Sequence, residues 1–151
     1  MQLLIENRQK KVKVDRRRLR QTANKIIREL GCRDKEISLA LVDNDQIREI
    51  NRQYLNRDYP TNVIAFSQLE GDFGDLNPTL LGDVVISVER AAGDGPAGGL
   101  TLDDELDFLF IHGLLHLLGY EHENTTEAEA QRMKDKAELL FYNLKGFKIY
   151  S

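Results

Sequence analysis

The chain has 151 residues, of which 41% are hydrophobic and 30% are charged, and its formal net charge is −4. This composition excludes the disordered and fibrous classes, and the length favours one domain, which we expect to span residues 1–151. A single cysteine, Cys32, excludes an internal disulfide and the zinc sites that are built from cysteine pairs. No apolar stretch approaches the length of a membrane span, which is about 18 residues. The N-terminus lacks the charge order of a signal peptide. We therefore expect a cytoplasmic protein with no membrane partner.

Positive charge is concentrated near the N-terminus. The first 30 residues hold ten Lys or Arg against three acids, a sum of +7, whereas the rest hold eleven against twenty-two, a sum of −11. The common explanation for such a run is the solvated face of an amphipathic helix. The alternative is a surface for a polyanion such as RNA. The residues concerned are Arg16, Arg17, Arg18, Arg20, Lys25 and Arg28.

Local signals predict two short strands and a helix in the first 31 residues. Residues 2–5 are apolar enough for a strand, and Val12 and Val14 alternate with lysines as in an edge strand. Asp15 can cap a helix whose apolar residues keep a 3.6-residue period until Gly31 ends it.

The middle of the chain is predicted to alternate strands and helices. Residues 36–42 form a strand, and a helix capped by Asp43 should stop near Asn56. Two β-rich runs follow, at residues 62–66 and 83–88, with a connection of about fifteen residues that exceeds the usual length.

The last third is predicted to be mostly helical. A short helical segment over residues 89–92 precedes the glycine-rich run 93–99, which we expect to be a flexible loop. Thr101 can cap a helix through Leu118, and Thr126 can cap a last helix that ends at Gly146. The irregular alternation predicts an α+β fold, with a small mixed β-sheet of about four strands flanked by helices.

All three histidines lie in the segment HGLLHLLGYEH, as His112, His116 and His122. The first two are spaced i, i+4 in a predicted helix, so both imidazoles project from one face, as in a zincin-like metal-binding helix. Gly119 can end that helix and turn the chain so that His122 becomes a third ligand. Three imidazoles suit one zinc ion per chain and leave a fourth position open, which is typical of a catalytic site.

Two other interpretations also fit features of the histidine segment. The leucines around the histidines would also fit a buried polar cluster, but burying two imidazoles without a partner would cost several kcal/mol. The spacing also matches metzincin proteases, which have a glutamate as general base where this chain has Gly113. The missing base argues against a protease and leaves hydrolysis of a substrate such as a phosphodiester open.

Three segments resemble the YbeY endoribonucleases, which are also called rRNA maturation factors. HGLLHLLGYEH is similar to the family motif H-G-x-L-H-L-x-G-Y-D-H, with Glu121 where the family usually has aspartate. RDYPTNVIAF at residues 57–66 resembles the pattern K-D-x-P-T-[DN]-V-L-S-F, and LLGDVVIS at residues 80–87 is a third match. The resemblance covers about residues 36–145.

The resemblance implies a bacterial cytosolic metalloprotein with a central sheet flanked by helices. It further implies a single-strand-specific RNA hydrolase that acts in 16S rRNA 3′-end maturation and ribosome quality control, with ribosomal RNA and the small ribosomal subunit as partners. On this resemblance His112, His116 and His122 are the zinc ligands.

One position departs from the family pattern. The family commonly has an arginine after an aromatic residue upstream of the second motif, but here Leu55 follows Tyr54. Arg57 or Arg52 can replace this phosphate contact, although each is equally explained as an exposed charge at a helix end.

Two acidic residues are weaker candidates. Glu121 can accept a proton during catalysis or fix the tautomer of a liganding imidazole. Asp83 can line a cleft at the start of a strand or act as an ordinary cap.

Two functions therefore remain open from the sequence. The first is a zinc-dependent endoribonuclease. The second is a ribosome-associated assembly factor with a structural three-histidine metal site and little nuclease activity.

Overall fold

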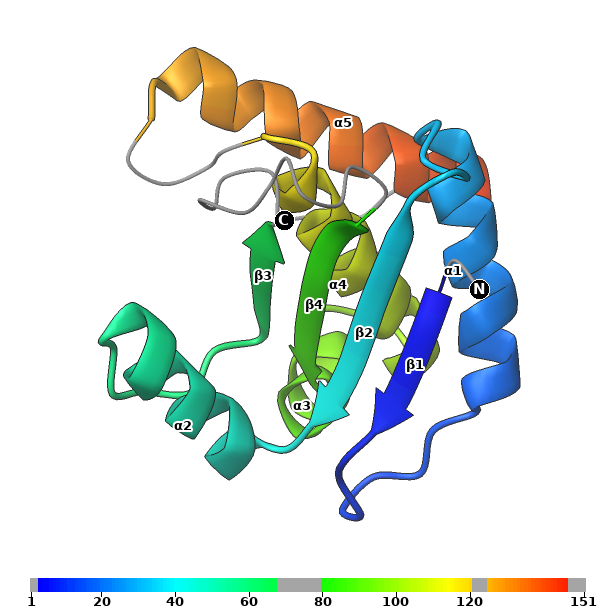
Figure 1. Cartoon of the computed structure of the whole chain (residues 1–151). Helices are drawn as coiled ribbons and strands as arrows, with labels where there is room; N and C mark the ends of the chain where they lie inside the picture. The colour runs from blue at the N-terminus through cyan, green and yellow to red at the C-terminus, as the bar shows by residue number, and fades with distance from the viewer. Residues whose placement is uncertain (1–2, 68–79, 121–124, 147–151) are drawn as a thin grey trace.

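The computed structural model describes residues 3–67, 80–120 and 125–146, which form an α+β fold around a four-stranded sheet (Figure 1). The strand order is β1-β2-β4-β3. The pairs β1–β2 and β2–β4 are parallel, whereas β3 and β4 are antiparallel, so the predicted mixed sheet is confirmed. The strands are β1 (Leu3–Asn7), β2 (Glu36–Val42), β3 (Val63–Ser67) and β4 (Leu80–Ser87).

Helices cover the two faces of the sheet unequally. Within the described ranges, four helices share the larger core on one face of the sheet, and the last of them packs on two of the other helices. One helix, α2, lies over a smaller core on the other face (Figure 1). The helices are α1 (Arg16–Glu29), α2 (Asn44–Leu55), α3 (Val88–Ala97), α4 (Leu102–Leu117) and α5 (Glu127–Lys145).

The central strands are buried on both faces. In β2, Leu39 and Leu41 belong to the larger core, and Ala40 between them belongs to the smaller one. In β4, Val84 and Val85 divide between the two cores in the same way. Successive side chains of a strand point to opposite faces, so these near-continuous apolar runs supply both cores.

The helix ends follow the local capping signals. The Asp15 side chain accepts a hydrogen bond from the Arg18 amide, and Asp43 with Gln46 forms a reciprocal capping box at the start of α2. Asn56 ends α2 in the left-handed conformation. The predicted start of α1 and both ends of α2 are confirmed.

The predicted edge strand at Val12 and Val14 is wrong. The Gln9 side-chain amide donates to the Val12 carbonyl at 2.8 Å and its oxygen accepts from the Val12 amide at 2.9 Å. One side chain therefore occupies both the N–H and the C=O group of Val12, so neither group pairs with a neighbouring strand.

The prediction of a loop at residues 93–99 is also wrong, because α3 continues to Ala97. Gly95 is buried where α3 meets the start of α4, and a Cβ atom there would lie 3.0 Å from the Glu105 Cβ and 3.1 Å from the Thr101 carbonyl oxygen. The glycine permits a close helix contact whose burial outweighs its low helix propensity.

Two of the six basic residues assigned to a solvated helix face are engaged in the fold instead. The Arg18 guanidinium contacts the fully buried Asp107 of α4, and Arg20 donates to the Leu3 carbonyl at 2.8 Å. Both contacts fix α1 against its neighbours. The solvated-face interpretation therefore applies to only part of this run.

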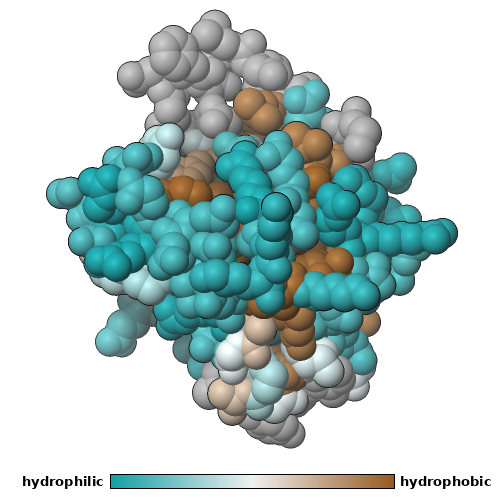
Figure 2. Space-filling view, turned by 90° about the horizontal axis from the view of Figure 1, so that it is seen from below, coloured by the Kyte–Doolittle hydropathy of each residue, from teal (hydrophilic) through white to brown (hydrophobic). Residues whose placement is uncertain are grey.

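The view from below is largely hydrophilic, and hydrophobic residues show there only as narrow patches between polar ones (Figure 2). Among the described residues, no helix has the combination of length and apolarity that crossing a bilayer requires.

Candidate metal centre

The helix α4 carries the two described histidines, and its ends are fixed by local signals. Thr101 caps its start by accepting from the Asp104 amide at 3.1 Å. At its end the Gly119 amide donates to the His116 carbonyl and the Tyr120 amide donates to the Leu115 carbonyl, both at 3.0 Å. This pair of bonds, with Gly119 at φ 98°, is a Schellman motif. The predicted helix and its glycine turn are thus confirmed.

His112 and His116 lie side by side on one face of α4. Their ring centroids are 4.9 Å apart with an interplanar angle of 71°, and both side chains are half-buried. In a tetrahedral zinc site with nitrogen ligands at 2.0–2.1 Å, neighbouring nitrogens are separated by about 3.4 Å. The spacing of the two rings is compatible with that arrangement, so the pair fits a zinc ion.

The third predicted ligand, His122, and the predicted catalytic candidate, Glu121, lie outside the described residues. Within the described part of the chain, no three His, Cys, Asp or Glu residues come together as a metal site. The three-histidine set therefore stays a prediction for this chain.

The packing of α4 on the sheet explains why Gly113 stands between the histidines. Gly113 is buried, and a Cβ atom there would lie 2.6 Å from Val84 Cγ1 and 3.4 Å from Val63 Cγ2. Any side chain at this position would push the helix off strands β3 and β4. The glutamate of a metzincin protease has no room here, which gives a structural reason for the missing base.

Arg52 and Arg57 lie at the end of α2 and just beyond it, and both are exposed. Arg52 forms an ion pair with Glu49 one turn earlier on the same helix. The backbone amide of Arg57 donates to the Asn51 carbonyl at 3.2 Å, directly after the left-handed Asn56. The structure thus gives Arg52 a carboxylate partner within its own helix, and it places Arg57 on the turn that leaves α2.

Sequence reasoning missed Asn51, which holds the segment around Arg57 in place. Asn51 is buried, and its side-chain amide donates to the Tyr59 carbonyl at 2.9 Å while its own carbonyl accepts from Arg57. The sequence signal for Asn51 was its position four residues after the buried Ile47, on the side of α2 that faces the sheet. Buried amides of this kind need hydrogen-bond partners, so Asn51 fixes the loop that carries Arg57.

Asp83 is not at the start of a strand but within β4, on the face that α2 covers. It lines an open hollow of about 530 Å³ together with Tyr54, Phe66 and Ser38. Val84, the next residue, points to the opposite face and contacts α4. The sheet therefore separates Asp83 from the histidine pair. Asp83 lines a hollow, but that hollow lies on the α2 side of the sheet and not beside the histidines.

Comparison with known proteins gives a consistent result. A sequence model of a protein family described as Endoribonuclease YbeY matches residues 4–145. The chain is 52% identical over 147 residues to Endoribonuclease YbeY of Syntrophus aciditrophicus strain SB, covering 97% of this chain and 92% of that protein. It is 48% identical over 141 residues to Endoribonuclease YbeY of Geobacter sulfurreducens, covering 93% and 94%.

A solved structure supports the fold. The chain is similar to the solution structure of TM1509 from Thermotoga maritima with a TM-score of 0.64, covering 95% of this chain and 89% of that one. The sequence identity in this comparison is 23%. The likeness therefore bears on the α+β architecture alone.

Proposed function

Because this chain belongs to the endoribonuclease YbeY family and is thus a hydrolase of RNA phosphodiester bonds, we propose that it is a zinc-dependent, single-strand-specific enzyme. We place its activity in 16S rRNA 3′-end maturation and ribosome quality control. Its partners are then ribosomal RNA and the small ribosomal subunit, in the cytoplasm. Residues 1–151 act as one metal-dependent hydrolase domain in this proposal.

The observation that supports a metal centre best is the histidine pair on α4. Two imidazoles with ring centroids 4.9 Å apart stand half-buried on one helix face, and the Schellman turn at Gly119 redirects the chain just before His122. We propose His112, His116 and His122 as the ligands of one zinc ion. When bound, zinc supplies Lewis acidity toward a phosphoryl oxygen and lowers the pKa of water.

The other candidate residues act on RNA by charge and proton transfer. Arg57 holds a phosphate by a charge-assisted hydrogen bond. Arg52, five residues earlier and paired with Glu49, is the second candidate for a phosphate contact. Glu121, beside a proposed ligand, accepts a proton or orients the imidazole of His122. Family membership favours this enzyme over the assembly factor with a structural metal site.

The test combines metal content with RNA cleavage. Wild-type protein purified without chelator should contain about one zinc per chain and cut single-stranded RNA. Chelated protein and His116→Ala should lose both properties, while Gln131→Ala, an exposed substitution on α5, should keep both. Thermal unfolding checks that His116→Ala is folded, and a peptide substrate should stay intact with every preparation.

The outcomes separate the two functions. Equal cutting by wild-type, chelated and His116→Ala preparations would identify a contaminating nuclease. Zinc bound at full stoichiometry without RNA cleavage, with small ribosomal subunits still bound, would replace the enzyme with the assembly factor. Full zinc content in folded His116→Ala would remove His116 from the ligand set.

A further inference from the structure

The outer face of α1 carries cations that form no ion pair in the described part of the chain. The buried side of this helix is formed by Leu19, Ala23, Ile26 and Ile27. On the opposite side, Arg17, Asn24, Lys25 and Arg28 are all exposed. Arg17, Asn24 and Arg28 are separated by seven and four residues and share one stripe, and Lys25 lies three residues before Arg28. Arg17 and Arg28 are eleven residues apart, so this face is about 16 Å long. We call Arg17, Asn24, Lys25 and Arg28, together with Arg33 beyond the end of the helix, the basic face.

The cations of the basic face are not neutralised by the described part of the protein. In that part, Arg17, Lys25, Arg28 and Arg33 form no ion pair, whereas Arg8, Arg48 and Arg90 each pair with a nearby carboxylate. A protein with a net charge of −4 thus keeps a local concentration of positive charge on one helix. Such a patch attracts polyanions.

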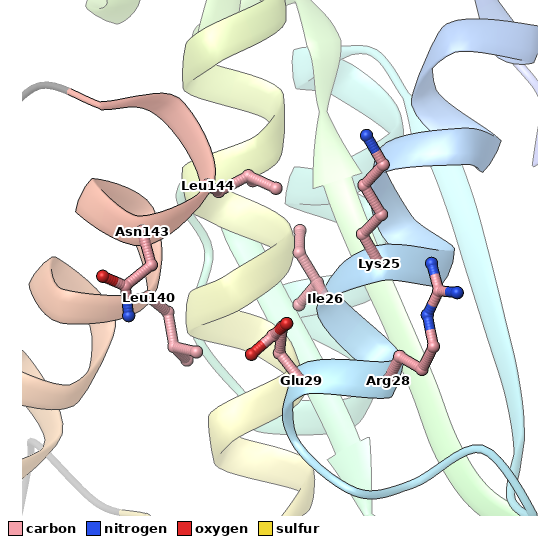
Figure 3. Close-up of a pocket in the computed structure, with 7 residues that line it drawn as sticks. All are labelled: Lys25, Ile26, Arg28, Glu29, Leu140, Asn143 and Leu144. Carbon is pink, nitrogen blue, oxygen red and sulfur yellow. The ribbon is translucent and has the colours of Figure 1, made fainter.

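The only acidic residue within α1, Glu29, points elsewhere. Its carboxylate extends into the groove between α1 and α5, toward Leu140, while the Arg28 guanidinium extends to the far side of α1 (Figure 3). Lys25 and Arg28 also line this groove, but in the described part of the chain no ion pair joins Glu29 to either of them. Glu29 therefore leaves the charge of Arg28 available.

A shallow hollow gathers donor groups on the basic face. Asn24, Ile27, Arg28 and Arg33 line it, and its volume is about 280 Å³. Two guanidinium groups and one carboxamide around a concave surface suit the oxygens of a phosphate, because guanidinium groups can donate two parallel hydrogen bonds to it. The basic face therefore has a concave site for a phosphate as well as positive charge.

The basic face and the histidine pair lie at opposite edges of the sheet. α1 packs beside β1, the first strand in the order β1-β2-β4-β3, while the Gly113 region of α4 packs on β3 and β4 (Figure 1). Strands are spaced about 4.8 Å apart, so the outer strands are about 14 Å apart. One phosphate cannot contact both places. The ion pairs of Arg18 with Asp103 and Asp107 fix α1 to α4, so the two places keep a constant separation.

We propose that the basic face is a second RNA-binding surface, which holds the phosphate backbone of a strand at a distance from the site of cleavage. The proposal rests on RNA being the substrate of this family, and it does not depend on the metal. It predicts that long RNA gains affinity from the basic face, whereas a short oligonucleotide that occupies only the cleavage site does not.

The experiment compares two double variants of the full chain. Arg28→Gln/Arg33→Gln removes two charges from the basic face, and Lys134→Gln/Lys136→Gln removes two charges from α5 as a matched control. Binding of a long single-stranded RNA is measured over a range of salt concentrations, and cleavage is measured on the long RNA and on a short oligonucleotide. Thermal unfolding verifies that both variants are folded.

We expect the basic-face variant to bind the long RNA several-fold more weakly at low salt. Each phosphate contact on a single strand contributes about 0.7 to the slope of log K against log salt, so the slope should fall by about 1.4. KM for the long RNA should rise, with kcat and the cleavage of the short oligonucleotide unchanged. The control variant should match the wild type in every assay.

If the folded basic-face variant binds the long RNA with the same affinity and salt slope as the wild type, the proposal of a second RNA-binding surface is wrong. That result would favour an acidic protein as the ligand of this patch. An equal loss in both double variants would also overturn it, because the effect would then be one of net charge. A wild-type protein that neither binds nor cuts RNA would overturn the proposed function itself. The two failures are therefore distinguishable.

Discussion

Arg18 and Asp107 form a two-pronged ion pair between helices that are far apart in the sequence. Arg18 Nη1 lies 3.0 Å from Asp107 Oδ2, and Nη2 lies 3.2 Å from Oδ1. Lys145 Nζ, at the end of α5, lies 2.6 Å from the same Oδ2. The fully buried Asp107 carboxylate thus joins α1, α4 and α5. Burial lowers the pKa of Arg18, but the hydrogen bond and charge of Asp107 outweigh it and raise that pKa overall.

Replacing Asp107 with asparagine should destabilise the fold strongly. The substitution leaves two partly buried cations without their shared carboxylate, which costs about 3–5 kcal/mol when one partner of a buried pair is removed. Asp103→Asn is the matched control, since Asp103 pairs with the same arginine but is about half exposed, and its loss should cost at most about 1 kcal/mol. Urea unfolding at neutral pH measures both. Similar losses of unfolding free energy in the two variants would show that the buried Asp107 contributes no more stability than the half-exposed Asp103.

The contact between Asp104 and Lys145 should make stability depend on pH in acid. Burial raises the pKa of Asp104, but hydrogen bonds from Lys145 and Thr101 outweigh it, and the pKa falls below its ordinary value of 3.8. A lowered carboxyl pKa contributes stability that is present above about pH 4 and is lost as the pH falls through the folded value. Asp104→Asn removes the titrating carboxylate and leaves the contact of Lys145 with Asp107 in place, so the variant should be less stable at pH 7 and should lose less stability below pH 4. Urea unfolding at several pH values tests this. An acid loss as steep as that of the wild type would exclude the pair as its source.

The close contact of α4 with the sheet should make Gly113 intolerant of a methyl group. A Cβ atom at this position would lie 2.6 Å from Val84 Cγ1, so Gly113→Ala should cost about 1–3 kcal/mol through overpacking. The control is Gly93→Ala in the middle of α3, where a Cβ atom meets nothing within 4 Å. That variant should gain about 0.5–1 kcal/mol from helix propensity. Thermal unfolding compares the two, and the same sign of change in both would contradict the packing argument.

Leu55 gives a test for the arginine that the family commonly has near this position. The side chain is 43% exposed at the last residue of α2, where a cation is also favourable to the helix dipole. Leu55→Arg should therefore leave the unfolding temperature nearly unchanged and add a phosphate contact, raising RNA affinity at low salt and the salt slope by about 0.7.

Leu55→Gln is the matched control for that variant, because it removes the apolar side chain without adding charge. It should bind RNA with the affinity and salt slope of the wild type. Binding of single-stranded RNA across a salt series measures all three proteins. Equal affinity of Leu55→Arg and Leu55→Gln would mean that this end of α2 does not reach the backbone.

Local sequence determined the helix ends and the placement of the histidine pair. Caps such as Asp15 and Thr101 act on amides within three residues, and Gly119 supplies a left-handed turn that few other residues adopt. His112 and His116 share a face because a helix repeats every 3.6 residues. These features depend on near neighbours in the chain, so they can be predicted without knowledge of the fold.

Tertiary contacts decided the features that local signals missed. Gly95 lies in a helix because α3 meets α4 there, and Arg18 leaves the solvated face because Asp107, 89 residues away, lies buried within reach. Asp83 and the histidine pair fall on opposite sides of the sheet because β4 runs between them. Each outcome depends on which distant groups become neighbours after folding, and the free energy of those contacts exceeds the local preferences that the sequence displays.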